Sequence, residues 1–219
     1  MIELTGINKS FSLGKNTVNV LDNINLRIEE GSFLGIVGQS GSGKSTLSNI
    51  IAGLLKPTKG KVEIDGRNIW KLSDRKISEF RNKTLGFVFQ SFNLIPSLTA
   101  LENVMLPLAY SKIRNKKRTE LAKIELERVG LLERMNHKPF EMSGGQMQRV
   151  AIARAMINKP KIIICDEPTG NLDTESSENV MNILREINCG GVTVIMVTHN
   201  PEYKKYFTGL ITLKNGKII

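Results

Sequence analysis

The chain has 219 residues, of which 40% are hydrophobic and 24% charged, and this ordinary composition excludes a disordered, collagen-like or coiled-coil protein. Its length corresponds to one large domain or one and a half, enough to bury a core without disulfides or metals. The 31 Lys and Arg against 21 Asp and Glu give a formal charge of +10. That excess indicates an anionic partner, such as a nucleotide, a nucleic acid or an acidic membrane surface.

Two cysteines, Cys165 and Cys189, are too few for a disulfide framework and indicate a reduced, cytosolic compartment. The first residues lack the basic start and apolar stretch of a signal peptide. The longest aliphatic runs are far shorter than the roughly 20 residues needed to span a bilayer. We therefore expect any membrane role of the chain to be peripheral.

Short apolar runs alternate with longer helical patterns along the chain. The first run, Phe33–Val37, predicts a buried strand, and residues 61–66 predict an antiparallel addition with tight turns. Further buried strands are predicted at Leu85–Phe89, Ile162–Cys165 and Val192–Val197. Near-continuous apolar strands separated by helices are typical of a sheet covered on both faces, so we predict an α/β fold.

The stretch from about 91 to 158 has helical patterning and no convincing strand, with Pro96 and Pro107 as interruptions. We expect it to form a helical subdomain inserted into a core made of residues 1–90 and 159–219, within a single domain. A basic run from Lys112 to Arg118 lies in this stretch. Its ordinary interpretation is a solvated helix face or loop, and a phosphate-binding patch is the alternative.

A first phosphate-binding motif, GQSGSGKS, follows the strand at Phe33–Val37 and precedes a helical pattern, which is the context that GxxxxGK[ST] requires. Its glycines let several backbone N–H groups point at one phosphate, and the helix N-terminus adds positive charge. We expect Lys44 to reach the β- and γ-phosphates and the Ser45 hydroxyl to ligate Mg²⁺. The predicted nucleotide-binding residues of this loop are Gly38, Gln39, Ser40, Gly41, Ser42, Gly43, Lys44, Ser45 and Thr46.

A pair of carboxylates, Asp166 and Glu167, follows the strand predicted at Ile162–Cys165, and open α/β sheets bind ligands at such strand ends. Asp166 is suited to hold Mg²⁺, and Glu167 to orient and deprotonate an attacking water. His199 ends the next strand, where we expect it to sense the γ-phosphate. The predicted catalytic residues are thus Glu167, His199 and Lys44.

A second phosphate-binding helix start is predicted at Ser143–Gln146, the sequence SGGQ. Ser143 is a natural N-cap, and Gly144 and Gly145 permit close approach of an anion. The chain thus carries two such helix starts but only one lysine-bearing loop and one carboxylate pair. This asymmetry indicates a site shared by two chains.

In these motifs, their order and their spacing, nearly the whole chain resembles the ATP-binding-cassette (ABC) ATPases, whose signature is SGGQ. The resemblance implies a P-loop NTPase (RecA-like) core with a mixed sheet, an antiparallel β addition and an inserted helical subdomain. It implies ATP and Mg²⁺ as cofactors, with Gln90 as a third Mg²⁺ contact beside Ser45 and Asp166. It also implies nucleotide contacts from Phe11, Gln90, Ser143, Gly144, Gly145, Gln146 and Asp173.

The family resemblance further implies two chains meeting head to tail, so that ATP bound by one is capped by the signature of the other. Gly170–Asp173 corresponds to the D-loop of the family. Phe11 stands where an aromatic, usually Tyr, stacks on adenine, and Met142 replaces the usual Leu before the signature.

The segments Phe87–Val104 and Asp166–Asp173 resemble one bacterial branch, that of lipoprotein-release, macrolide-efflux, antimicrobial-peptide-resistance and cell-division ATPases. This resemblance implies a separately encoded transmembrane permease and a location at the cytoplasmic face of the membrane. The apolar segment from Phe92 to Tyr110 would then form a docking groove as well as subdomain core, or core alone.

A soluble ABC ATPase acting on nucleic acid or the ribosome is the alternative, since it would also explain the charge of +10. The 52 residues between Gln90 and Ser143 leave no room for the coiled-coil insertion of DNA-repair members. Translation-factor members carry two cassettes in one chain. This chain has one, so we expect no nucleic-acid partner. A GTPase or small-molecule kinase is disfavoured because Asn158–Lys161 lacks the Asp that guanine recognition requires and because SGGQ has no place in those proteins.

Overall fold

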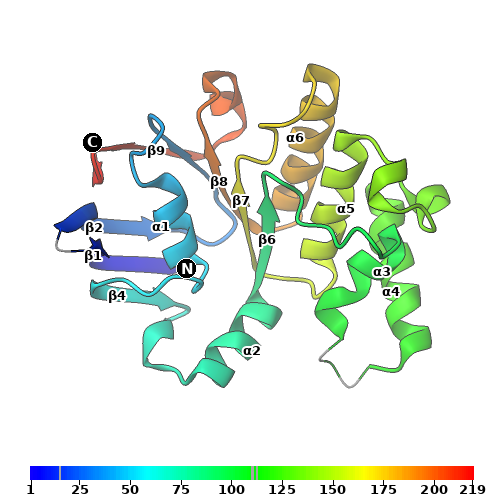
Figure 1. The fold of residues 1–219 in the computed structure, drawn as a ribbon, viewed down its shortest axis with the longest axis horizontal. Coiled ribbons are helices and arrows are strands. Elements are labelled where there is room, and N and C mark those ends of the chain that lie inside the picture. The colour runs from blue at the N-terminus through cyan, green and yellow to red at the C-terminus, as the bar shows by residue number, and fades with distance from the viewer. Residues whose placement is uncertain (15, 110, 112) are drawn as a thin grey trace.

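The larger of two sheets has six strands in the order β10-β9-β3-β8-β7-β6 (Figure 1). The structure is a computed structural model that describes residues 1–14, 16–109, 111 and 113–219. The strands β9, β3, β8, β7 and β6 are parallel, and β10 is antiparallel to β9. Their bounds are β3 Phe33–Val37, β6 Leu85–Phe89, β7 Ile162–Asp166, β8 Thr193–Thr198, β9 Gly209–Lys214 and β10 Lys217–Ile218. The four strands predicted from apolar runs are β3, β6, β7 and β8, and the predicted α/β fold with a mixed sheet is confirmed.

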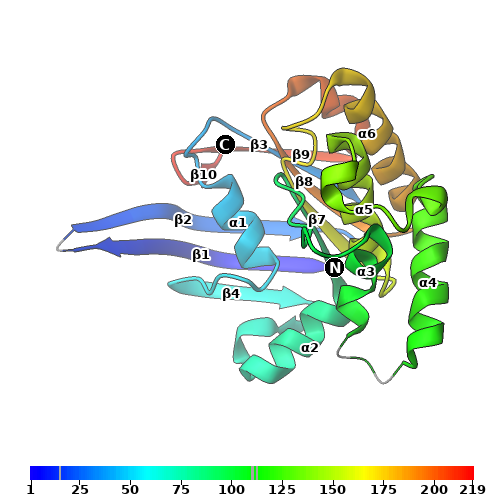
Figure 2. The ribbon, with the colours of Figure 1, turned by 45° about the vertical axis from the view of Figure 1, so that its right-hand side comes forward.

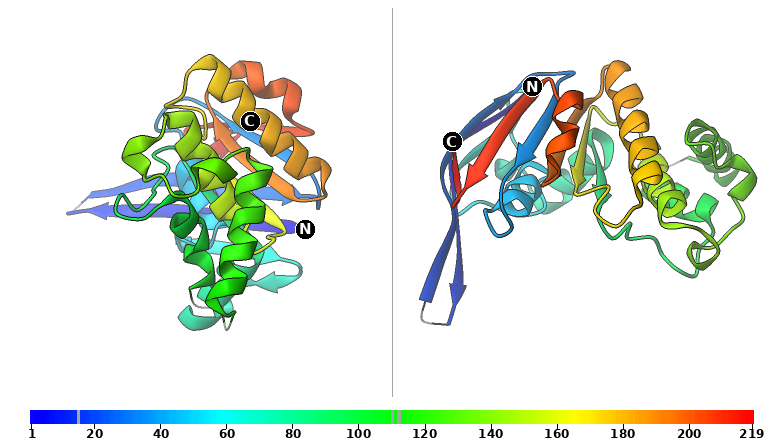
Figure 3. Two further views of the ribbon diagram at one scale, coloured as in Figure 1. Left: turned by 90° about the vertical axis from the view of Figure 1, so that its right-hand side faces the viewer. Right: turned by 90° about the horizontal axis from the view of Figure 1, so that it is seen from above.

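The smaller sheet has four antiparallel strands in the order β2-β1-β4-β5. Its strands are β1 Ile2–Leu13, β2 Asn16–Ile28, β4 Lys59–Ile64 and β5 Arg67–Asn68. The antiparallel addition predicted at residues 61–66 is therefore confirmed. The strands β1 and β2 extend beyond the rest of the molecule (Figure 3), and their length was not predicted from the sequence.

The helix α1 (Lys44–Ile51) lies between the two sheets (Figure 2). One hydrophobic cluster joins Leu47 and Ile50 of α1 to Ile7 of β1 and to Ile36 of β3. On the other face of the larger sheet, α5 (Gly144–Met156) and α6 (Thr174–Cys189) pack over a second cluster (Figure 1).

Strand residues alternate between these two clusters. In β7, Ile162 and Ile164 belong to the cluster on the α1 face, whereas Ile163 and Cys165 belong to the cluster on the α5 and α6 face. Successive side chains of a strand point to opposite faces of a sheet, so a strand covered on both faces is apolar at every position. This arrangement explains the near-continuous apolar runs in the sequence.

The described part of the stretch from 91 to 158 contains the helices α3 (Ala100–Met105), α4 (Asn115–Arg128) and α5. Residues from all three share the cluster that covers one face of the larger sheet. Close packing of α5 on β6 requires Gly86, because a Cβ there would lie 2.6 Å from the carbonyl oxygen of Ala155. The remaining helices are α2 Asp74–Thr84 and the 3₁₀ helices Ile69–Lys71, Leu106–Leu108, Leu132–Arg134, Pro139–Glu141 and Pro201–Tyr206.

The basic run from Lys112 to Arg118 begins outside the described residues, since Lys112 is not among them. Arg114, Lys116 and Lys117 are exposed at the start of α4. The guanidinium of Arg118 donates to the carbonyl oxygens of Ser111 and Ile113, at 2.9 and 2.7 Å. Tyr110, the last residue of the predicted docking segment, also lies outside the described residues.

Among the helices in the described ranges, none combines the length and the apolar character that crossing a membrane requires. Cys165 is fully buried in β7, and burial raises the pKa of its thiol, as expected of an inert apolar residue. Cys189 is exposed at the last position of α6.

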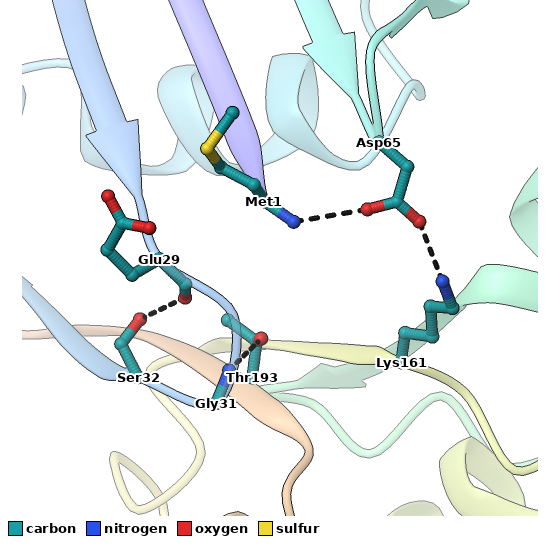
Figure 4. A network of polar contacts seen from close by, with 7 residues as sticks. All are labelled: Met1, Glu29, Gly31, Ser32, Asp65, Lys161 and Thr193. Atoms are coloured by element: carbon teal, nitrogen blue, oxygen red, sulfur yellow. Dashed lines mark hydrogen bonds and ion pairs between the residues drawn. The ribbon is translucent and has the colours of Figure 1, made fainter.

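Polar contacts join the smaller sheet to the N-terminal ends of the parallel strands (Figure 4). Asp65, in the turn after β4, accepts hydrogen bonds from Lys161 Nζ at 2.8 Å and from the amino group of Met1 at 3.1 Å. Close by, the N–H of Gly31 donates to the hydroxyl of Thr193 at 2.9 Å.

Replacing Asp65 with Asn should reduce stability in a pH-dependent way. The hydrogen bonds from Lys161 and from the amino group of Met1 lower the pKa of Asp65. Such a carboxyl stabilises the folded state above its unfolded pKa of about 3.9, and this contribution is lost as the pH falls through the lower folded pKa. Because the Asp65 side chain is 38% exposed, we expect Asp65→Asn to lower the free energy of unfolding by at most ~1 kcal/mol at pH 7.

Urea denaturation of wild type and Asp65→Asn at neutral pH and at a pH below about 3.9, where the carboxyl of the unfolded chain is protonated, tests this expectation. The difference between the two proteins should shrink at the acidic pH. A difference of equal size at both pH values would show that the carboxylate charge is not responsible.

Candidate nucleotide-binding and catalytic site

The loop between β3 and α1 forms a tight turn, as the GxxxxGK[ST] motif requires. Gly41 and Gly43 have φ angles of 76° and 102°, which glycine adopts far more readily than other residues. A Cβ on Gly43 would lie 2.9 Å from the carbonyl oxygen of Val20 in β2, so the loop passes directly against that strand. The helix α1 begins at Lys44, and its first residues line a cavity together with the loop.

Lys44 is held by the loop itself. Its ammonium donates to the carbonyl oxygens of Gly38 and Gln39 at 2.9 and 2.8 Å, and the residue is only 6% exposed. A cavity of about 260 Å³ adjoins it. The lining residues are Val20, Ser40, Gly41, Gly43, Lys44, Ser45, Thr46 and Glu167. The fold thus brings the loop and the glutamate of β7's carboxyl end to one cavity.

Ser45, in the first turn of α1, contacts Asp166 at the end of β7. The Ser45 hydroxyl donates to Asp166 Oδ1 at 3.1 Å. Burial raises the pKa of Asp166, and the neighbouring charge of Glu167 adds to this effect, while the Ser45 hydrogen bond and Lys44 lower it. A hard cation bound here would offset the desolvation of the carboxylate. Hydroxyl and carboxylate oxygens are ligands that Mg²⁺ prefers, so this pair fits the metal that the motifs imply.

Glu167 follows β7 with a φ of 46°, in the left-handed region that non-glycine residues seldom adopt. Its N–H donates to the carbonyl oxygen of Val197 at 3.0 Å, which ties this turn to β8. His199 Nδ1 lies 3.2 Å from Glu167 Oε2. Strained backbone of this kind is concentrated at functional sites, and here it directs a partly buried carboxylate toward the cavity.

The signature SGGQ starts α5 as predicted, with Ser143 as the N-cap. The Ser143 hydroxyl accepts a hydrogen bond from the N–H of Gln146 at 3.2 Å, and Gln146 Oε1 accepts one from the N–H of Ser143 at 3.0 Å. A Cβ on Gly145 would lie 2.5 Å from the Ser176 hydroxyl oxygen. The glycine therefore also permits close packing of α5 on α6, a role that was not predicted from the sequence.

Gln90 and Asp173 are not among the residues that line this cavity, and their contacts are with residues 170–176. A Cβ on Gly170 would lie 2.8 Å from Gln90 Nε2, and Asn171 Nδ2 donates to the Gln90 carbonyl oxygen at 3.2 Å. Asp173 caps α6 by accepting from the N–H and the hydroxyl of Ser176, both at 2.8 Å. These hydrogen bonds, the backbone one foremost, lower the pKa of Asp173.

Phe11 lies on the long hairpin, paired with Val18 across β1 and β2, and is 39% exposed. Lys9 Nζ lies 4.8 Å from the centroid of its ring. Val20, two residues beyond Val18, lines the cavity, so the hairpin carries Phe11 along the same side of the site. Val20 itself was not predicted, because only the folded hairpin brings it to the loop.

The site combines three features. The loop between β3 and α1 forms a phosphate-binding turn, a carboxylate pair stands at the end of β7, and His199 lies beside Glu167. Together they define a P-loop nucleoside triphosphatase of α/β fold. The sequence family described as "ABC transporter" matches residues 21–170. The chain therefore belongs to the ABC transporter ATPases, and the resemblance seen in its motifs is confirmed.

Relatives and solved structures agree with this assignment. The ABC transporter ATP-binding protein YvrO of Bacillus subtilis is 48% identical over 219 residues, covering 100% of this chain and 96% of YvrO. The macrolide export ATP-binding/permease protein MacB of Aggregatibacter actinomycetemcomitans is also 48% identical over 219 residues, which make up 34% of MacB. The cassette MJ0796, solved as a dimer in a post-hydrolysis state with ADP and Pi, aligns with a TM-score of 0.92 and 44% identity, covering 100% of this chain and 96% of that one.

The protein is accordingly the ATP-binding, ATP-hydrolysing subunit of an ABC transporter. The alternative of a soluble ABC ATPase acting on nucleic acid or the ribosome is not favoured, since the relatives are named as ABC transporter and macrolide export proteins.

Proposed function

We propose that the chain works as one nucleotide-binding domain in a head-to-tail pair that drives a separately encoded permease at the cytoplasmic face of the membrane. The observation that carries this proposal is a single cavity that has Lys44 and Ser45 on one wall and Glu167, in contact with His199, on another. In this proposal residues 1–90 and 159–219 form the core that holds this cavity, and residues 91–158 the helical subdomain.

The loop residues hold the triphosphate of ATP. Backbone N–H groups from Gly38 to Thr46 bind phosphate oxygens, and the ammonium of Lys44 turns from the loop carbonyls toward the β- and γ-phosphates. Ser45, Asp166 and Gln90 hold Mg²⁺, which when bound neutralises charge on the phosphates. Phe11 stacks on the adenine ring, since stacking needs only an aromatic face.

Glu167 acts as the general base. Its carboxylate accepts a proton from the water that attacks the γ-phosphate, and the contact with His199 fixes the orientation of the carboxylate. His199, through its contact with Glu167, in turn senses whether the γ-phosphate is present.

The second copy completes the site. Ser143, Gly144, Gly145 and Gln146 lie outside the residues that line the cavity, yet they form a helix N-terminus suited to an anion. In the head-to-tail pair they cap the γ-phosphate bound by the other copy, with Asp173 beside them. The relative MJ0796 has been solved as a dimer, which supports a pair.

The permease is a separate chain in this proposal. In MacB, a relative described as an ATP-binding/permease protein, the matching region makes up only 34% of the length. The segment from Phe92 to Tyr110 then contributes to a docking groove for that partner, which transmits ATP-driven closure to the membrane.

Co-expression with the membrane protein encoded beside this chain's gene tests the proposal. After solubilisation of membranes, the tagged chain should co-purify with that membrane protein and hydrolyse ATP. Recovery with ribosomes or DNA, and not with membranes, would overturn it.

A further inference from the structure

The turn that follows Gln90 has an unusual backbone. Phe92 and Asn93 are consecutive non-glycine residues with φ angles of 60° and 49°. Left-handed conformations are unfavourable for residues with a Cβ, above all for a bulky one such as Phe, so surrounding contacts must hold such a pair in place.

Arg154, on the signature helix α5, provides these contacts. Its Nη2 donates to the carbonyl oxygen of Phe92 at 2.7 Å, and its Nη1 donates to that of Asn93 at 2.5 Å. The planar guanidinium suits two adjacent acceptors, because its N–H groups form a rigid fork. The arginine is half-buried, and burial lowers the pKa of its guanidinium.

Gln148, six residues earlier on α5, holds the strand end before Gln90 and the segment after Glu167. Its Nε2 donates to the carbonyl oxygen of Pro168 at 2.7 Å and lies 3.4 Å from that of Phe89. One helix is therefore tied to the chain on both sides of Gln90 and directly after the predicted base.

The turn held by Arg154 also touches the signature. A Cβ placed on Gly144 would lie 3.7 Å from Cζ of the Phe92 ring. The turn therefore places the Phe92 ring beside Gly144, the glycine that is proposed to cap ATP bound by the other copy.

We infer that Arg154 is a positioning residue for ATP hydrolysis. It fixes the turn after Gln90, and so it holds Gln90 and Gly144 at a fixed position relative to each other. The inference rests on the proposed function, because it assigns both residues to nucleotide contacts. It adds a residue that contacts neither nucleotide nor metal and acts through the Phe92–Asn93 turn.

Kinetics of Arg154→Ala and Arg154→Lys test this inference, with Arg118→Ala as a matched control. Arg118 likewise donates to two backbone carbonyls, but within 111–113, away from Gln90. We expect Arg154→Ala to lower kcat by ~10- to 100-fold, the effect of misplacing a site group by about 1 Å. The KM for ATP should change little, because the loop around Lys44 is untouched. Arg154→Lys should recover part of kcat, and Arg118→Ala should match wild type.

Amide hydrogen exchange over residues 90–95 and thermal melting separate positioning from general stability. Exchange there should accelerate in Arg154→Ala and not in Arg118→Ala, at similar melting temperatures. Unchanged kcat in Arg154→Ala, or equal losses in Arg154→Ala and Arg118→Ala, would overturn the inference. A wild-type chain that does not hydrolyse ATP would instead overturn the proposed function. In that case, exchange over residues 90–95 that is the same in Arg154→Ala as in wild type would by itself refute the role of Arg154.

Discussion

Glu167→Gln should lower the turnover number for ATP by roughly 10²–10⁴, the usual contribution of a positioned general base, while ATP binding persists. Glutamine has nearly the same shape as glutamate but accepts no proton from the attacking water. Its amide still reaches His199, which lies 3.2 Å from the carboxylate in the wild type, so the local geometry should be retained. Because cleavage is blocked, the paired, ATP-bound form should accumulate, and light scattering with ATP and Mg²⁺ should detect it.

Glu127→Gln is the matched control for this substitution. Glu127 is an exposed glutamate of α4 and lines neither the nucleotide cavity nor the pocket that adjoins Glu167 and His199. Phosphate release should be as fast in this variant as in wild type. Undiminished hydrolysis by Glu167→Gln would remove Glu167 from the role of base and would require another group to take the proton.

Lys44→Ala should weaken ATP binding by roughly 10- to 100-fold, since hydrogen bonds from a charged donor contribute about 1.5–3 kcal/mol each. Lys44 is almost fully buried beside the cavity, and its ammonium, which donates to two loop carbonyls, would exchange them for phosphate oxygens when ATP binds. Fluorescence titration with a labelled ATP analogue, followed by competition with ATP, measures the change.

Lys217→Ala provides the comparison for the loss of one positive charge. Lys217 is exposed and pairs with Asp22 at 3.1 Å, so its removal should leave ATP affinity unchanged. A titration of Lys44→Ala that coincides with wild type, in a variant whose circular dichroism shows a folded chain, would contradict the phosphate-binding assignment of the loop.

The parts of this protein that could be predicted from sequence are those whose cause is local. The strands β3, β6, β7 and β8 were predicted because both faces of the sheet are covered there, which makes nearly every position apolar. The loop before α1 and the N-cap Ser143 were predicted for a similar reason: glycine conformations, backbone donors and a capping box act within a few residues.

The remaining features depend on segments that are distant in sequence. The packing of Gly145 on Ser176, the approach of Val20 to Gly43 and the bonds from Arg154 to Phe92 each join separate elements. The roles of Phe11, Gln90 and Asp173 in nucleotide binding stay predictions; in the structure Phe11 lies beside Lys9, Gln90 beside Gly170 and Asp173 beside Ser176.

The two cysteines offer a practical route to watching copies of this chain meet. Cys165 is buried with a raised thiol pKa, so a maleimide dye should leave it unmodified, whereas Cys189 is exposed. Asn188, its neighbour, donates to the carbonyl oxygen of Gly31 just before β3, at the edge of the sheet opposite the nucleotide cavity. The natural sequence therefore supplies one attachment point remote from the chemistry, and resonance energy transfer between singly labelled copies can report association without any engineered residue.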